Sequence, residues 1–283
     1  MAGTVNCFSP TVALGLDPWG VPLSEVAKYW PVAVSFGGGL NSTALLIHWA
    51  KEKWTPPHKI IFADTGAERA ETYWHLGDFA QWLVAQGMPN IEVTRKGGRK
   101  ETLEEYCLRT KHLPSLAYGG KSCSFKFKIE PQERDINRWS LARQAWAAGT
   151  KVVKIIGYGA EEQKRISRAK LEDEKYFYRF PLDELGMDRD ACERTIVEAG
   201  RKPPPKSSCF FCPSTKKQEI FNLPEDLKRR AINIEVVSSI AGNSRSTKGL
   251  GRQFAWSELL KGENTPEAIV APCMYCADGE AAL

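Results

Sequence analysis

Short apolar runs alternate with amphipathic stretches along the first part of the chain. The apolar runs have the length and the β-branched residues of buried strands, and they span residues 32–36, 59–63, 91–95 and 151–157. The stretches between them repeat their apolar positions at helical spacing and predict helices at about 42–53, 70–86, 101–110 and 131–148. Strands that alternate with helices predict an α/β fold, in which helices cover both faces of a parallel sheet.

The pattern changes after the fourth predicted strand. The segment EEQKRISRAKLEDEK (residues 161–175) is densely charged, which is typical of a mobile loop or a solvated helix. A helix fits residues 188–200, and helical patterns return from Lys216 to about Ile240 and in FAWSELLKG. The Pro-rich RKPPPK is the clearest joint between the two parts. We therefore expect an α/β domain at 1–205, with an N-terminal extension at 1–30, and a helical C-terminal part at 206–283.

A glycine run joins the first predicted strand to the helix that follows it. In a parallel sheet, ligands bind beyond the carboxyl ends of the strands. Backbone N–H groups of Gly37–Gly39 can surround an anion there, and the helix adds the positive end of its dipole. Asn41, Ser42 and Thr43 supply further donors. The pattern therefore predicts a phosphate-binding loop, with a simple tight turn as the alternative.

Two well-known phosphate loops can be compared with this segment. A GK[ST] ending is missing, which excludes the loop of P-loop nucleotide hydrolases. A dinucleotide fingerprint fits better, because Gly37 and Gly39 have its spacing and Asp64 ends the next strand at about the right distance for a ribose contact. Ser42 stands where its third glycine is expected. NAD or FAD binding therefore stays open at this point.

The eight cysteines carry the other candidate chemistry. The N-terminus has no signal-peptide pattern and no apolar run has the length of a membrane span, so we expect a cytoplasmic protein without a membrane partner. In a reducing compartment, CxxC pairs indicate a metal, an iron–sulfur cluster or a redox dithiol. The two pairs are Cys209/Cys212 and Cys273/Cys276. For the single residues Cys7, Cys107 and Cys192 we expect core packing instead.

The net charge is mildly basic, +5 at pH 7. It suits an anionic ligand such as a nucleotide but does not by itself indicate nucleic acid. The basic segments RKGGRK (95–100) and KSCSFKFK (121–128) would suit RNA or DNA, the second because aromatic residues alternate with its lysines. A solvated basic face with one or two phosphate contacts is the alternative that we favour for both.

Five motifs, in order, cover about residues 32–213 of the chain. They are VSFGGGLNST, FADTGAERAETYWHL, KSCSFKFKIEP, IIGYGAEEQKR, and FPLDELGMDRDACERTIVEAG followed by PPPKSSCFFCP. This set resembles the phosphoadenosine phosphosulfate (PAPS) reductase branch of the PP-loop ATP pyrophosphatase superfamily. The resemblance implies an adenine nucleotide α-hydrolase-like fold with a Rossmann-like parallel sheet.

The resemblance also implies which residues form the site. It implies nucleotide binding, with ATP or a PAPS-like ligand, by Ser35, Phe36, Gly37, Gly38, Gly39, Asn41, Ser42, Asp64, Thr65 and Gly157. Arg165 is the candidate catalytic residue, since an arginine grips phosphate or sulfate with two donors; Arg168 is a weaker candidate for the same role. No histidine shows metal-ligand spacing.

A thiolate-bound metal centre is the second implication. Cys123, Cys209 and Cys212 match the positions that bind an iron–sulfur cluster in adenylylsulfate reductase-like members of the family. Such clusters are commonly held by four thiolates, and Ser124 stands where the family has another cysteine. Cys273 or Cys276 would replace it in a 4Fe–4S site. A Zn site made by the two CxxC pairs alone is the alternative.

The chain also departs from the family pattern. Leu40 and Asn41 stand where the loop has lysine and aspartate, and an amide holds Mg²⁺ less well than a carboxylate does. Near the C-terminus, Cys273 and Cys276 lack the adjacent histidine of the family's reductases. These changes bear on ATP cleavage and on sulfonucleotide reduction, and they leave nucleotide binding in place.

The function expected from the sequence is therefore an adenine-nucleotide-binding enzyme of sulfur chemistry. It would reduce a sulfonucleotide, or use ATP to activate a substrate for sulfur insertion, with an electron-donor or sulfur-donor protein as a partner. One alternative is an ATP pyrophosphatase that adenylates a nucleic-acid base or a small molecule. The other is a non-catalytic nucleotide- and metal-binding module of a larger assembly. An oligomer is compatible with each of these.

Overall fold

The computed structural model describes residues 16–97, 101–114, 121–243 and 247–261 of the 283-residue chain. The chain divides into two compact units, which are described separately. The first unit comprises Met1–Leu103 and Ala117–Cys209, and the second comprises Glu104–Leu116 and Phe210–Leu283. The predicted boundary near residue 205 stays a prediction.

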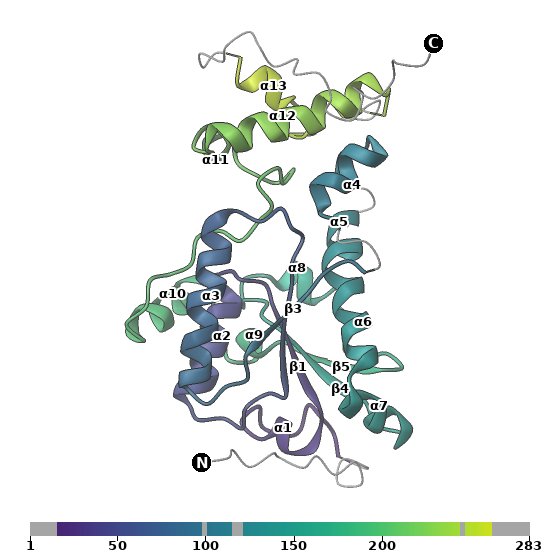
Figure 1. The fold of residues 1–283 in the computed structure, drawn as a ribbon. Helices are drawn as coiled ribbons and strands as arrows, with labels where there is room; N and C mark the ends of the chain where they lie inside the picture. The colour runs from purple at the N-terminus through teal and green to yellow at the C-terminus, as the bar shows by residue number, and fades with distance from the viewer. Residues whose placement is uncertain (1–15, 98–100, 115–120, 244–246, 262–283) are drawn as a thin grey trace. The chain divides into compact units, whose positions relative to one another are not determined.

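A five-stranded parallel sheet forms the centre of the first unit (Figure 1). Its strands are β1 (Val32–Phe36), β2 (Lys59–Ala63), β3 (Ile91–Thr94), β4 (Val152–Ile156) and β5 (Tyr176–Arg179), in the order β3-β2-β1-β4-β5. The order reverses at β1, and this arrangement places ligand sites at the carboxyl ends of the central strands. The predicted α/β class with a Rossmann-like parallel sheet is confirmed.

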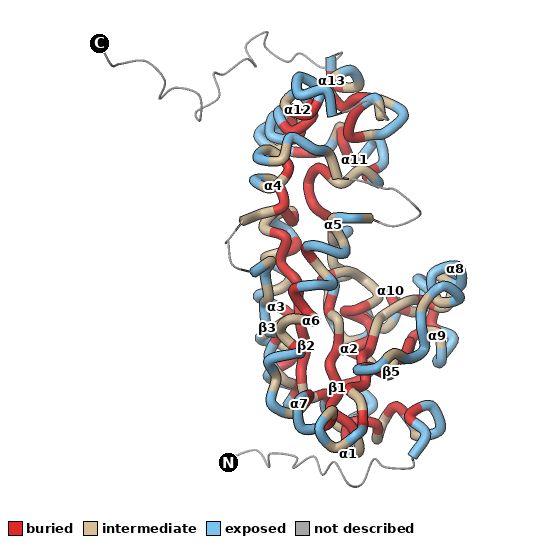
Figure 2. Tube along the Cα trace, turned by 90° about the vertical axis from the view of Figure 1, so that its right-hand side faces the viewer, coloured by how far each residue is buried: buried red, intermediate tan, exposed pale blue. Residues whose placement is uncertain are grey.

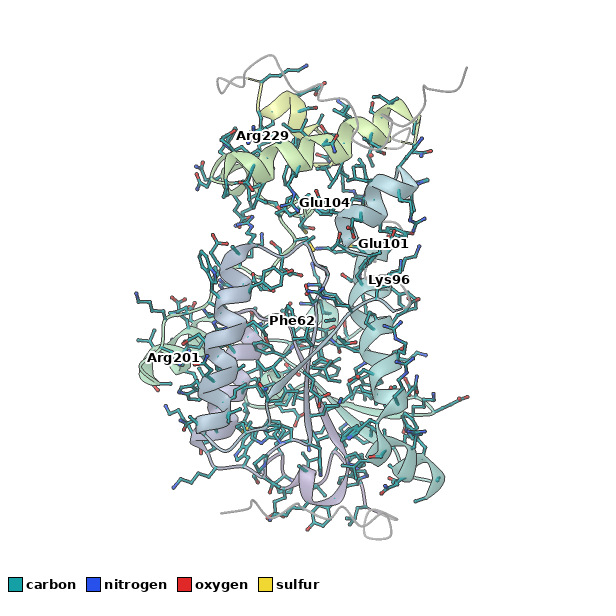
Figure 3. All side chains as sticks on the ribbon, in the orientation of Figure 1. Phe62, Lys96, Glu101, Glu104, Arg201 and Arg229 are labelled. Carbon is teal, nitrogen blue, oxygen red and sulfur yellow. The ribbon has the colours of Figure 1, made fainter. Side chains whose placement is uncertain are left out.

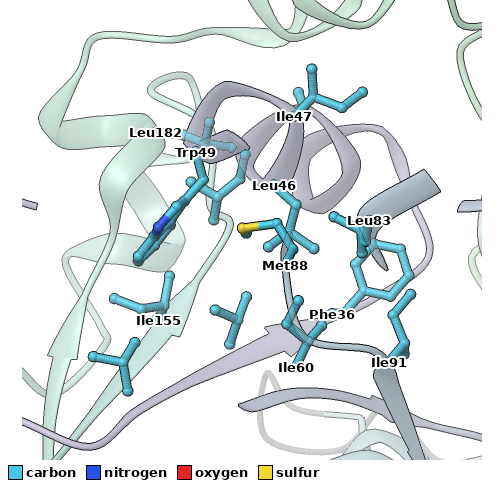
Figure 4. Packing of buried hydrophobic residues seen from close by; sticks show 14 of the residues in the cluster. Phe36, Leu46, Ile47, Trp49, Ile60, Leu83, Met88, Ile91, Ile155 and Leu182 are labelled. Carbon is cyan, nitrogen blue, oxygen red and sulfur yellow. The ribbon is translucent and has the colours of Figure 1, made fainter. Parts of the chain in front are cut away.

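The two faces of the sheet bury different side chains, because successive residues of a strand point to opposite faces. On one face, Val34, Phe36, Ile60 and Ile155 pack with apolar residues of the covering helices (Figure 4). On the other face lies a smaller cluster around Ala33 and Ile61. The central strands are thus buried along nearly their whole length (Figure 2).

Helices cover the face with the larger cluster. They include α2 (Leu40–Lys51), α3 (Ala70–Ala85) and α10 (Arg189–Glu198), with the short α1 (Val26–Tyr29) and α9 (Pro181–Glu184). Helix α10 packs directly on α2. Val26, Ala27 and Trp30 are buried in the same cluster, so the described end of the predicted N-terminal extension belongs to the core.

The opposite face is covered by two helices where the sequence predicted one. The helix expected at 131–148 is divided into α6 (Glu130–Arg138) and α7 (Ser140–Ala147). Trp139 has an extended backbone between them, and its ring lies 5.8 Å from Lys59 Nζ and packs on the cluster below the sheet. Ahead of α6, the segment KSCSFKFK forms α5 (Ser122–Ser124) and a single turn of π-helix, η3 (Phe125–Ile129).

The sequence analysis missed the edge strand β5. Its residues, YFYR, lack an apolar/polar alternation, and the strand is held by its parallel pairing with β4. The charged segment before it contains one short helix, α8 (Gln163–Ile166). Part of that segment turns back on the sheet, as the backbone bond from Tyr178 N to Leu171 O shows, at 2.8 Å.

The second unit is helical in its described residues. It contains most of α4 (Leu103–Thr110), α11 (Lys217–Phe221), α12 (Glu225–Ile240) and α13 (Trp256–Leu259). The helix predicted from Lys216 to Ile240 is interrupted before Pro224, whose ring suits the start of α12 but not a helix interior. Arg230 of α12 holds Glu104 of α4 with two donors and lies over the ring of Phe210. Among the described helices of the whole chain, none is long and apolar enough to cross a membrane.

A buried carboxylate organises the end of this unit. Glu235 is 4% exposed and accepts hydrogen bonds from Leu250 N, Trp256 N and Ser257 N at 2.7, 2.9 and 3.0 Å, and from Ser257 Oγ at 2.6 Å. One side chain thereby accepts hydrogen bonds from the loop that leads into α13 and from the free N–H groups of that helix's first turn.

We expect Glu235→Ala to lower the free energy of unfolding by about 3 kcal/mol or more. The substitution leaves several buried donors without an acceptor, and each costs about 1–3 kcal/mol. Urea titration followed by circular dichroism measures the change. Glu258→Ala, on the exposed side of α13, is the matched control and should cost less than about 0.5 kcal/mol. Equal stability of the two variants would contradict this role of Glu235.

Candidate functional site

The glycine run forms the joint between β1 and α2, as the sequence predicted. Gly39 is the N-cap of α2, and Thr43 N donates to its carbonyl oxygen at 3.0 Å. Gly38 has a φ of +69°, which a side chain rarely adopts. A Cβ at this position would lie 3.3 Å from Phe62 Cε2 and 3.4 Å from Thr72 Cγ2. Position 38 therefore favours glycine for two reasons: the positive φ, and the nearness of Phe62 and Thr72 to any Cβ.

Two serines fix the shape of this loop. Ser42 Oγ accepts from Gly37 N and donates to Gly39 O, both at 3.2 Å. Ser207, from the segment after the three prolines, donates through its hydroxyl to Gly37 O. The loop is thus held from its own helix and from a distant part of the same unit.

The predicted site residue Gly157 has a packing reason to be glycine. It follows β4, and a Cβ on it would lie 3.3 Å from Ser42 Cα and 3.4 Å from Ser42 N. The end of β4 therefore approaches the first turn of α2 at backbone distance. This brings the loop after β4 beside the loop Gly37–Gly39, which we call the glycine loop.

Glu162 connects these two loops. Its Oε2 accepts from Asn41 Nδ2 and from Gly159 N, each at 3.2 Å, and its Oε1 forms an ion pair with Arg165. Arg165 also lies over the ring of Tyr158, 4.2 Å from the centroid. An amide at position 41 can donate to Glu162, whereas the family's aspartate would face it with a second negative charge. Both arginines, Arg165 and Arg168, are exposed, and Arg165 lies beside the loop through its ion pair with Glu162.

Asp64 lies at the carboxyl end of β2, as predicted, and is almost completely buried. Its Oδ1 accepts from Gly66 N at 2.7 Å and from Tyr73 Oη at 2.8 Å, and its Oδ2 accepts from Arg95 Nε at 2.8 Å and pairs with Arg95 Nη2. Burial and this hydrogen bond raise the pKa of Tyr73, which stays a donor. A carboxylate has about four lone-pair sites, and protein donors occupy all of them. This bonding argues against the ribose contact that a dinucleotide site needs.

Several buried polar atoms near the loop lack a hydrogen-bond partner among the described residues. They are Glu68 Oε2, Arg69 Nε and Nη2, Thr72 Oγ1 and Ser208 Oγ. Thr72 lies against Gly38, and Ser208 follows the Ser207 that holds the loop. An unpaired buried polar group costs about 1–3 kcal/mol, so a concentration of them at one place indicates a site that a polar ligand completes. Arg69 and Thr72 can supply donors to an anion.

A thiol lies in the same part of the first unit. Cys209 is buried, and its backbone forms an antiparallel bridge with Glu68. Its Sγ lies 3.2 Å from Thr65 Oγ1 and 3.8 Å from Glu68 Oε1. The Lys128 ammonium pairs with Glu68 Oε1 at 3.0 Å. Burial alone would lower the pKa of Lys128, but the charges of Glu68, Cys209 and Cys123 hold it above its ordinary value.

The five predicted metal ligands are placed only in part. Cys123 and Cys209 belong to the first unit, and the charges of both help to raise the pKa of Lys128. Cys212 belongs to the second unit, and Cys273 and Cys276 lie outside the described residues. Among the described residues, no group of three or more His, Cys, Asp or Glu is arranged to hold a metal. The whole ligand set therefore stays a prediction.

The remaining cysteines that the structure describes are buried. Cys107 is a buried residue of α4. Cys192 lies in the large core cluster, where burial raises the pKa of its thiol to about 12. A thiol with a raised pKa is unreactive. Cys7 lies outside the described residues.

Two predicted nucleotide contacts turn their side chains elsewhere. Ser35 donates to Gln132 Oε1 of α6 at 2.8 Å, and Phe36 stacks on Phe79 in the core. Any ligand contact of these residues would therefore use the backbone. The site also includes residues that the sequence analysis did not single out, namely Arg69, Thr72, Lys128, Glu162 and Ser207. All five lie inside the motifs quoted above, so the motifs carried a signal for them.

The chain is similar in structure to a known protein, although its sequence gives no match. No family model matches the chain, and no curated protein matches it. Among solved structures it is similar to the crystal structure of phosphoadenylyl-sulfate (PAPS) reductase from Candida auris in a phosphate complex. The TM-score is 0.42 and the identity is 17%, over 71% of this chain and 91% of that chain.

A histidine supports the first turn of α2 from the side. His75 Nε2 lies 3.0 Å from Thr43 Oγ1, and its ring stacks on Phe79 at 5.4 Å. Burial, helped by the charge of Arg201, lowers the pKa of His75 to about 4. Arg201 lies beside α3, over the ring of Phe79 (Figure 3). The ring of His75 is therefore neutral in the folded protein at neutral pH.

We expect stability to fall as the pH is lowered from about 6.5 to about 4, partly through His75. In this window the unfolded state binds a proton at His75 and the folded state does not, so protonation favours unfolding. Urea midpoints across the window measure the slope, and His75→Gln should make it shallower. The exposed His112→Gln is the control. An unchanged slope in His75→Gln would contradict the lowered pKa.

Proposed function

We propose that this protein is an adenine-nucleotide-binding enzyme of sulfur chemistry, resembling the PAPS reductases. The glycine loop at Gly37–Gly39 would bind the phosphate or phosphosulfate end of the nucleotide. The reaction would be reduction of a sulfonucleotide, or activation of a substrate by ATP for sulfur insertion. The adenine part of the proposal depends on the five motifs of the sequence.

One observation carries the proposal. Ser207 bonds to the glycine loop, and Cys209, two residues later, contacts Thr65 and Glu68. Two residues span at most about 7 Å. A thiol therefore lies within a short distance of the backbone that would hold the phosphates, which is the juxtaposition that sulfur chemistry on a nucleotide requires.

The chain's own residues have clear parts in such a site. The backbone at Gly38 lets an anion approach closely, and the start of α2 favours negative charge. Arg69 and Thr72 have buried donors to offer. Arg165 can exchange its ion pair with Glu162 for a bidentate contact with phosphate or sulfate. Lys128 would stabilise negative charge on the ligand or on Cys209.

A thiolate-bound iron–sulfur cluster belongs to the proposal, with Zn as the alternative metal. Its ligands would be Cys123, Cys209, Cys212 and either Cys273 or Cys276. When bound, such a cluster supplies a redox-active or electrostatic centre, tuned by neighbouring charges and hydrogen bonds. Thr65, whose hydroxyl lies 3.2 Å from Cys209 Sγ, and the charge of Lys128 would contribute to this tuning.

Two chemistries remain to be separated within this proposal. Release of sulfite from a sulfonucleotide in the presence of a thiol-donor protein would identify a reductase. Release of pyrophosphate from ATP with a candidate acceptor would identify an activating enzyme, in which Mg²⁺ is expected to take part. Glu162, which accepts from Asn41 Nδ2 at 3.2 Å, is a carboxylate beside the loop that could contribute to holding that cation.

We expect Gly38→Ala to weaken adenine-nucleotide binding by about tenfold or more, because the new Cβ narrows the space beside Phe62 and Thr72. Gly87→Ala is the matched control. Gly87 also has a positive φ, +76°, but a Cβ on it would meet nothing within 4 Å. Both variants carry the same backbone strain of about 1–2 kcal/mol, and they differ in the close contacts that only the Cβ at position 38 makes. Isothermal titration calorimetry with ATP and with a sulfonucleotide measures the affinities, and equal affinities would sink the proposal.

We expect anaerobically purified protein to be brown, with the broad visible absorption of thiolate-bound iron–sulfur. Cys123→Ser, Cys209→Ser and Cys212→Ser should each remove the colour. The core variant Cys192→Ser should keep it, and of Cys273→Ser and Cys276→Ser one should remove it. A colourless protein with stoichiometric zinc, in which Cys123→Ser changes nothing, would mean that the metal is zinc held by the two CxxC pairs.

A further inference from the structure

The first unit has a groove at the edge of its sheet, separate from the glycine loop. It lies between β3, the edge strand, and α6, and its volume is about 310 Å³. Its lining includes Arg95, Gly97, Arg134, Asp135 and Arg138. We call it the edge groove.

Two of its arginines are held in place by the fold. Arg95 is fixed through its Nε and Nη2, which donate to Asp64. Arg134 donates through Nη2 to the carbonyl oxygen of Arg95. The groove therefore has guanidinium groups whose orientation is determined before any ligand arrives, which lowers the entropic cost of binding.

The guanidinium of Arg134 lies close to the backbone of Gly97. A Cβ at position 97 would lie 2.0 Å from Arg134 Nη1 and 2.2 Å from its Cζ. Its φ is not in the positive range, so a Cβ here would act by displacing the guanidinium of Arg134, the movable end of that side chain. Residue 97 and Arg134 thus form one arrangement.

The charge of the edge groove is positive. Three arginines line it, and Asp135 is the acidic residue among the lining. Asp135 is already paired with Lys59, whose Nζ lies 3.2 Å from Asp135 Oδ2, and Lys59 also pairs with Glu92 of β3. Arg138 has no ion pair among the described residues and is exposed. Arg95 is already neutralised by Asp64, so Arg134 and Arg138, for which the described residues offer no ion pair, carry the positive charge that a ligand would meet.

We propose that the edge groove binds a phosphate group, as a phosphomonoester or a phosphodiester. A guanidinium presents a planar fork of donors that matches phosphate oxygens, and several around one groove favour a dianion over a carboxylate. The groove lies two strands from β1, about 10 Å across the sheet, so this phosphate is distinct from one bound at the glycine loop. The phosphate has two sources, a free phosphorylated small molecule or the backbone of a polynucleotide.

Two probes distinguish these sources. A fluorescent oligouridylate reports polynucleotide binding by anisotropy, at low and at physiological salt, and ribose 5-phosphate reports monoester binding by calorimetry. The variants are Arg134→Gln, Arg138→Gln and Gly97→Ala, the last of which displaces Arg134 without removing a charge. Arg189→Gln is the matched control, since Arg189 is exposed at the start of α10 on the other face of the sheet.

We expect Arg134→Gln and Arg138→Gln each to weaken binding by about tenfold, which is the effect of losing one charge-assisted contact. Gly97→Ala should weaken it in the same direction, and Arg189→Gln and Gly38→Ala should leave it unchanged. If the arginine variants bind the oligouridylate more weakly and with a smaller salt dependence than the wild type, the source is a polynucleotide. If they lose affinity only for ribose 5-phosphate, the source is a small molecule. Failure of the wild type to bind either probe would overturn the inference, as would equal losses in Arg189→Gln. If Gly38→Ala still binds the probe, the binding does not depend on the proposed nucleotide site at the glycine loop.

Discussion

The buried carboxylate of Asp64 is the interaction that holds three elements of the first unit together at the carboxyl end of the sheet. It joins the backbone after β2 to Tyr73 of α3 and to Arg95 after β3. A buried carboxylate is tolerated only when its lone pairs are filled. Loss of this one charge would release the loop after β2 and one arginine of the edge groove together.

The loop after β4 shows how an amide on the glycine loop is paired with a carboxylate on a neighbouring loop. The end of β4 at Gly157 approaches Ser42 closely, and Glu162 of the following loop accepts a hydrogen bond from Asn41. Glu162 also forms an ion pair with Arg165. The carboxylate thus connects the glycine loop to an arginine.

Much of the fold followed from the sequence, because four strands and the helices between them have strong local patterns. The edge strand β5 and the break at Trp139 were missed, since the first is held by pairing with β4 and the second by packing below the sheet. In the site, the glycine loop was predicted from Gly37–Gly39 alone. The role of Ser207 could not be, because it depends on a contact 170 residues away in the chain.

The electrostatics around Cys209 explain why a thiol can be buried beside an anion site. Glu68 is buried, and without Lys128 its charge would oppose both a thiolate and a nucleotide. With Lys128 paired to it, the local charge is close to balanced, and Lys128 still faces Cys123 and Cys209. A thiolate at Cys123 or Cys209 would therefore be stabilised by the charge of Lys128, whereas Cys192 lies in an apolar cluster that disfavours the charged form. Cys209 and Cys192 thus have different electrostatic surroundings within one unit.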